Sequence, residues 1–239
     1  MPAPGMQQNA DMTNHDLTSG DPTSSDPTSG DLTNNDPANG AGFERFTIKQ
    51  RITLMVNRYE VRSVNADGSE GPLIAMAQQK RMAFKEQVTF YTDETRTQPV
   101  FGFKARQRMD LAATYDVTDA SGMPIGSFRK EFAKSLLRST WRLNSSDGLQ
   151  AMGTERNQTI AILRRLWGLV PYVGEYLPCP FTFHFDFTAP DGSIVLSSER
   201  RKTLRDVYDV TLPTAPNGWR LDWRVGAAMA VALDALQSR

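Results

Sequence analysis

The C-terminal segment constrains the fold of this chain more than any other part of it. After Asp222, which suits a helix N-cap, the run Val225–Leu233 contains only apolar residues and glycine, and Ala235 and Leu236 continue it. A helix that is apolar on every face is either buried in protein or placed in a membrane. About 14 apolar residues are too few to cross a bilayer, which needs ~20. We therefore expect a helix surrounded by the rest of the protein.

The residues upstream predict what surrounds this helix. Apolar and polar residues alternate from Phe46 to Val56 and again from Phe181 to Phe187, as in half-buried strands. Acidic and glycine-containing turns separate such strands, with no long helices between them, which favours an antiparallel meander over a βαβ sheet. The C-terminal helix is slim, because five residues of the run Val225–Leu233 are glycine or alanine. About ten strands before a slim apolar helix predict a mainly β fold, a closed antiparallel β-barrel around a central hydrophobic α-helix.

The N-terminal residues have a different composition. Residues 1–42 contain six Asp and no Lys, Arg, Glu, Phe, Tyr, Trp, Ile or Val, and residues 11–40 are six pentapeptides that each begin with Asp. So little apolar surface cannot offset the entropy cost of folding. We expect a disordered acidic tail of Asp-x-Thr repeats over residues 1–42 and one barrel domain over residues 43–239. The tail is either a solubilising segment or an anionic tether that shields the domain.

The charges of the domain provide the candidate ligand-binding residues. The chain has 27 basic and 27 acidic residues, and because the tail holds six of the acidic ones, the rest of the chain has a net charge of about +6. Basic clusters follow the predicted strands, Lys104, Arg106 and Arg108 among them. They are either solvated rim charges that prevent edge pairing or a surface for anionic lipid head groups. The candidate ligand-binding residues are Arg129, Lys130, Arg200, Arg201, Lys202 and Arg205.

A second helical pattern lies between two predicted strands. From Asn157 to Tyr176 the apolar residues follow helical spacing, and Arg164, Arg165 and Trp167 belong to this segment. It either packs on one end of the barrel or places these three residues at a membrane interface.

The sequence offers little for catalysis or for metal binding. Cys179 is the one cysteine, so neither a disulfide framework nor a site of several thiolates can form within the chain. The two histidines are His15, in the tail, and His184, on a Phe-rich strand, and no phosphate-binding glycine loop or EF-hand spacing occurs. We expect no enzyme activity, cofactor or metal, and no nucleic-acid partner. Without a secretory signal pattern, we expect a cytoplasmic protein that can lie peripherally on the inner membrane surface.

Several segments together form a recognisable set of motifs: Phe46–Arg51, Tyr115–Asp119, Gly122, Ile125, Gly126, Phe183–Phe187 and Val225–Leu236. They resemble the LURP-one-related family, which is grouped with tubby C-terminal domains and phospholipid scramblases. The resemblance covers nearly everything after residue 43 and implies a twelve-stranded barrel threaded by the C-terminal helix. Together with the basic clusters, it leads us to expect a non-enzymatic binding module for anionic lipid head groups or another acidic ligand. A protein-binding scaffold, or scramblase-like activity without the usual calcium segment, are the alternatives.

Overall fold

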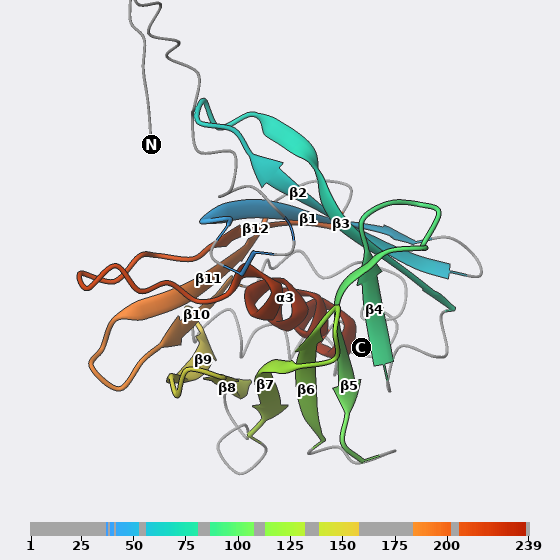
Figure 1. Cartoon of the computed structure of the whole chain (residues 1–239). Helices are drawn as coiled ribbons and strands as arrows, with labels where there is room; N and C mark the ends of the chain where they lie inside the picture. The colour runs from blue at the N-terminus through green and yellow to red at the C-terminus, as the bar shows by residue number, and fades with distance from the viewer. Residues whose placement is uncertain are drawn as a thin grey trace, which may run out of the picture. The chain divides into compact units, whose positions relative to one another are not determined.

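The computed structural model describes residues 37, 39–40, 42–52, 56–80, 87–107, 113–131, 139–157, 184–201 and 206–237. In these residues twelve antiparallel strands close into one barrel. Each strand pairs with its neighbours in sequence, and β12 closes the ring by pairing with β1. The C-terminal helix, α3, lies inside the ring of strands (Figure 1). The predicted closed barrel around a central helix is therefore confirmed.

The connections between successive strands alternate between the two ends of the barrel. Their bounds, with the helix last, are β1 Arg45–Ile52, β2 Val56–Val64, β3 Glu70–Lys80, β4 Gln87–Tyr91, β5 Pro99–Ala105, β6 Thr114–Asp119, β7 Pro124–Lys130, β8 Thr140–Ser145, β9 Gln150–Glu155, β10 His184–Thr188, β11 Ile194–Arg200, β12 Val207–Thr211 and α3 Trp223–Gln237.

The alternation in the sequence assigns the inner face of most strands correctly. In β10, Phe185 and Phe187 are buried while His184 and Asp186 are partly exposed. One prediction was wrong: residues 46–56 are not a single strand, because β1 ends at Ile52 and Val56 begins the antiparallel β2. The apolar period continues across this connection, so periodicity alone does not reveal the reversal of the chain.

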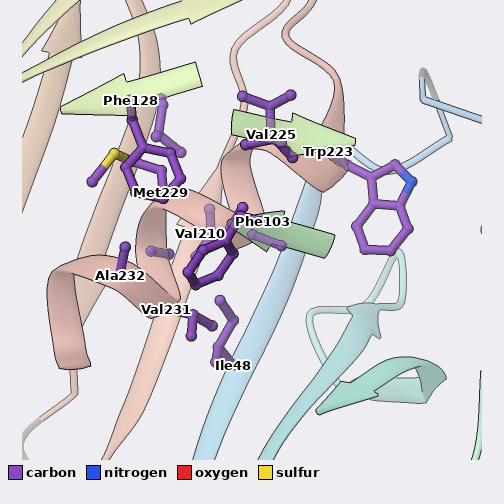
Figure 2. Packing of buried hydrophobic residues seen from close by; sticks show 14 of the residues in the cluster. Ile48, Phe103, Phe128, Val210, Trp223, Val225, Met229, Val231 and Ala232 are labelled. Carbon is purple, nitrogen blue, oxygen red and sulfur yellow. The ribbon is translucent and has the colours of Figure 1, made fainter. Parts of the chain in front are cut away.

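The helix is buried on every side, as its composition predicts. Asp222 is its N-cap, since its Oδ1 accepts the backbone N–H of Arg224 at 2.9 Å. Small residues let the wall approach closely: a Cβ on Gly226 would lie 2.9 Å from the Leu212 side chain. Figure 2 shows Val225, Met229 and Val231 of α3 among the wall side chains Ile48, Phe103 and Phe128.

Two hairpins have the same construction. The hairpin β6–β7 and the hairpin β10–β11 both contain an acidic-glycine turn, at Gly122 and Gly192, with φ of 87° and 88°. Both also have a register shift near the end of their first strand. It lies between Val117 and Thr118 in β6 and between Phe187 and Thr188 in β10. The barrel wall therefore contains two hairpins of the same construction.

The described residues all lie in one compact unit that spans residues 32–239. Within it, the backbone N–H of Trp223 donates to the carbonyl of Gly40 at 3.0 Å, and the Trp223 indole donates to the carbonyl of Asn39 at 3.1 Å. Residues 39 and 40 thus contact α3, although the sequence placed them in the tail. The boundary at residue 42 stays a prediction, and the expected helix from 157 to 176 lies outside the described residues beyond Asn157.

Candidate functional site

The two ends of the barrel differ in their connections. Because neighbouring strands are antiparallel, all odd-numbered strands finish at one end and all even-numbered strands at the other. Even-numbered strands are followed by residues 65–69, 92–98, 120–123, 146–149, 189–193 and 212–222, which we call the turn end. Odd-numbered strands are followed by residues 53–55, 81–86, 106–113, 131–139, 156–183 and 201–206, which we call the basic end.

The two ends carry opposite charge in the sequence. The connections of the basic end contain twelve Lys or Arg and five Asp or Glu, a net charge of +7. Those of the turn end contain two basic and six acidic residues, a net charge of −4. In chain order, the excess positive charge of the domain therefore falls in the connections that follow the odd-numbered strands, and most of these basic residues lie outside the described ranges.

The strand pleat separates the first predicted pair of ligand residues. Arg129 and Lys130 are consecutive in β7, so their side chains point to opposite faces of the sheet. Arg129 bonds Glu131 at 2.9 Å, and Arg142 reaches the same carboxylate at 3.1 Å. Lys130 lies over the ring of the buried Trp141, with Nζ 5.9 Å from the ring centre. Arg129 therefore belongs to the outer surface and Lys130 to the inner rim of the basic end.

The second pair, Arg200 and Arg201, is separated in the same way. Arg201 is bidentate to Asp209 on the outer surface, at 2.6 and 2.7 Å. Arg200 is opposite the buried Tyr208 in the sheet register, and its guanidinium pairs with Asp206. The remaining predicted site residues, Lys202, Arg205, Arg164, Arg165 and Trp167, lie outside the described residues.

A groove of about 490 Å³ runs along the outer face of β5. Its floor is Gly102, which stands between Thr89 of β4 and Thr118 of β6 in the sheet register. A Cβ on Gly102 would lie 2.8 Å from the carbonyl oxygen of Val88, so the groove depends on glycine at this position. We call it the β5 groove; it is lined by Gln87, Thr89, Pro99, Phe101, Gly102, Phe103, Lys104, Ala105, Arg106, Asp116, Thr118, Asp119, Ala120 and Gly122.

Two cations line the half of the β5 groove nearest the basic end. Lys104 is exposed and has no hydrogen-bond or ion-pair partner in the part of the chain that the structure describes. Arg106 is fixed by Asp116, which accepts from its Nε at 2.8 Å and from its Nη2 at 2.7 Å. Nη1 of Arg106 remains available as a donor. A free ammonium, an oriented guanidinium and two threonine hydroxyls are the groups that hydrogen-bond a phosphate or carboxylate.

The strand with His184 carries a closed ion-pair cluster. Arg156 is bidentate to Asp186, at 2.6 and 2.7 Å, and its Nη1 donates to Glu199 at 2.6 Å. Burial opposes ionisation of Asp186, but hydrogen bonds from Arg156 and Ser197 outweigh it and lower the pKa of this carboxyl. The described side chains of His, Cys, Asp and Glu contain no group of three that could hold a metal ion. This cluster is explained as a brace across β9, β10 and β11.

One buried polar group was missed by the sequence reasoning. Asp234 is only 1% exposed although it lies in the apolar helix, and it accepts hydrogen bonds from the hydroxyls of Tyr59 and Tyr208. The signal was present in the sequence, as a single carboxylate between Leu233 and Ala235 in a segment otherwise free of charge. Its partners could not be identified there, because Tyr59 is 175 residues away.

Comparison with known proteins identifies the family of this chain but not its activity. No described helix combines the length and apolarity needed to cross a membrane. No curated protein matches the chain. Three chains of known structure match; one is a porin-like protein from Bacteroides uniformis, with 8% identity over 72% of this chain and 97% of that one, and a TM-score of 0.21, too low to compare the two folds. The family model of LURP-one-related proteins matches residues 73–234, from β3 to the last turns of α3. Because this match covers more than half of the sequence, the chain belongs to the LURP-one-related family.

Proposed function

We propose that this LURP-one-related domain is a non-enzymatic binding module that holds anionic lipid head groups at the basic end, with the β5 groove as the described part of the site. The observation that carries the proposal is the segregation of charge, +7 in the connections of one end and −4 in those of the other. The module would work in the cytoplasm, at the inner membrane surface.

Whether a basic side chain is already paired with a carboxylate indicates how much it can contribute to binding an anionic lipid. Arg129 and Arg201 are neutralised by Glu131 and Asp209, so they have less to offer a ligand than the candidates from sequence alone suggested. Lys104 has its full charge available. Each basic residue near a negatively charged membrane contributes ~1 kcal/mol to binding. We therefore expect Lys104 to matter more than either paired arginine.

The test is sedimentation with vesicles of phosphatidylcholine alone and of phosphatidylcholine with phosphatidylserine. The domain should bind the anionic vesicles selectively, and Lys104→Ala should weaken binding by about fivefold, the equivalent of ~1 kcal/mol. Arg96→Asn is the matched control, because it removes one positive charge at the turn end and asparagine tolerates the φ of 55° there. It should leave binding unchanged.

Two further measurements separate the alternatives. Inorganic phosphate added as a competitor distinguishes a site for soluble anions, which it should block, from one that needs a membrane surface. Raising the ionic strength to 1 M shortens the Debye length to about 3 Å, which should abolish a lipid contact of this kind. Equal binding to neutral and anionic vesicles, or binding to neither, would contradict the lipid proposal. A protein partner retained at high salt would favour a scaffold instead.

A further inference from the structure

The last turns of α3 are joined to the barrel wall by one buried polar cluster. The Tyr59 hydroxyl donates to Oδ2 of Asp234 at 2.9 Å, and the Tyr208 hydroxyl donates to Oδ1. The side-chain amide of Gln50 donates to the Tyr59 hydroxyl at 2.8 Å. All four residues are buried. Because Gln50, Tyr59 and Tyr208 lie on the adjacent strands β1, β2 and β12, the cluster fixes the helix to one side of the wall.

The rest of the helix makes contacts of a different kind. From Val225 to Leu233 every side chain is apolar and buried, and such contacts are non-directional. These apolar contacts therefore place few directional constraints on the last turns of the helix. Hydrogen bonds to Asp234 have fixed lengths and directions. This cluster consequently sets the position of the helix end within the barrel.

The charge of Asp234 is the variable part of the cluster. Burial raises the pKa of the Asp234 carboxyl, and the hydrogen bonds from Tyr208 and Tyr59 only partly oppose this. Among the described charged groups that face it, Asp206 raises the pKa further and Arg200 lowers it. Burial, followed by the charge of Asp234, raises the pKa of both tyrosines, so they remain hydroxyl donors. Asp234 is thus the group of the cluster whose protonation can change.

We propose that Asp234 is a proton-operated latch: its protonated form holds the C-terminal turns of α3 against Tyr59 and Tyr208, and its ionisation loosens these turns at the basic end. An ionised carboxyl regains its hydration only by leaving the barrel interior, so loss of the proton favours the loosened state. The latch goes beyond the proposed function, since it holds whether or not the basic end binds an anion.

The direction of the pH effect follows from linkage. An acid whose pKa is higher in the folded protein than in the unfolded chain stabilises the fold fully below the unfolded pKa, and this contribution is lost as the pH rises through the folded pKa. Raising the pH should therefore weaken the last turns of α3. The first turns of α3, residues 223–229, contain no acidic residue, so the protection of their amides serves as an internal reference for the last turns.

The experiment is hydrogen exchange of the full chain across a pH series, with rates corrected for the intrinsic pH dependence of exchange. In the unmodified protein, protection of the amides of residues 231–237 should fall with rising pH relative to residues 225–229. Asp234→Asn keeps one acceptor and one donor for the two tyrosines but cannot ionise, so this dependence should disappear. Tyr59→Phe with Tyr208→Phe should lower protection of the last turns by about tenfold or more at low pH, where Asp234 is protonated and two bonds to a buried group are lost, and by less as the pH rises.

Three results would overturn the latch. The same pH dependence in Asp234→Asn would show that another group is responsible. An equal loss of protection in both halves of the helix would indicate global destabilisation. Unchanged protection in the double tyrosine variant would show that the bonds do not hold the helix. If Asp234→Asn fails to fold, the single variant Tyr59→Phe replaces it. This variant keeps the ionisable carboxyl but removes a hydrogen bond that lowers the pKa of Asp234, so the loss of protection in residues 231–237 should move to higher pH. A midpoint that stays in place or moves to lower pH would overturn the latch.

Discussion

The backbone N–H of Trp223 donates to the carbonyl of Gly40, so the first residue of the central helix is bonded to the segment that precedes the barrel. The indole of Trp223 also packs edge-on against Phe43, with ring centres 5.3 Å apart. Asn39, Gly40 and Phe43 thus contact the N-terminal end of α3. The family match begins only at residue 73, so it does not include this segment.

We expect Gly40→Ala to destabilise the domain. A Cβ at this position would lie 2.2 Å from Oδ2 of Asp222, the N-cap of α3, and 2.6 Å from its Cγ. Relief of that overlap must displace either the cap or the covering segment, at a cost of about 1–3 kcal/mol in the free energy of unfolding. Denaturant unfolding measures the loss. As a control, Gly68→Asn, at a positive φ with nothing within 4 Å of the added Cβ, should change stability by less than ~0.5 kcal/mol.

Gly153→Ala should disturb the wall of the barrel more locally. The added Cβ would lie 2.3 Å from the ring of Phe187, which is fully buried on the neighbouring strand β10. We expect a loss of about 1–3 kcal/mol from overpacking. Phe187→Leu in the same chain should recover part of this loss, since it removes the ring edge. A double-mutant cycle measures the recovery, and strict additivity of the two changes would show that the contact is not responsible.

Glu60 and Glu94 provide a matched pair for testing buried and exposed charge. Both bond Arg58, but the Glu60 side chain is 3% exposed, whereas that of Glu94 is 72% exposed. Glu60 also faces Arg51 at 3.3 Å and Arg62 at 3.6 Å. Glu60→Gln should therefore cost about 1–3 kcal/mol of stability, and Glu94→Gln less than ~1 kcal/mol. Equal losses in urea unfolding would contradict the burial argument.

Acid should weaken the turn end. Hydrogen bonds from Ser69, Thr95, Ser121 and Ser193 lower the pKa of Asp67, Asp93, Asp119 and Asp191, each in its own turn. A carboxyl whose pKa is lowered in the folded protein stabilises it above the unfolded pKa, and this contribution is lost as the pH falls through the folded pKa. Carboxyl titration by NMR should place these four groups below the ordinary value of 3.8 for Asp. Ser121→Ala should raise the pKa of Asp119 toward that value.

The sequence was sufficient to predict which residues of a strand face the core. It was not sufficient to predict which basic residues at the strand ends are left without an acidic partner. Phe185 and Phe187 were assigned to the core by alternation, which is a property of the extended backbone itself. The same alternation places Arg129 and Lys130 on opposite faces of the sheet, although two consecutive basic residues in the sequence suggested a single binding site. The acidic partner of Arg201, Asp209, comes from another strand, whereas that of Arg129, Glu131, lies only two residues further along the chain.

The sequence by itself determined that a slim apolar helix is enclosed by strands, because burial of apolar residues and the two-residue period of a strand are local properties. Only the tertiary structure decided that β12 meets β1, that Lys104 shares a groove with Thr89 and Thr118, and that Asp234 is held by Tyr59 and Tyr208. These relationships depend on the register and closure of the barrel. Both join residues far apart in the chain, and the pattern of neighbouring residues does not specify them.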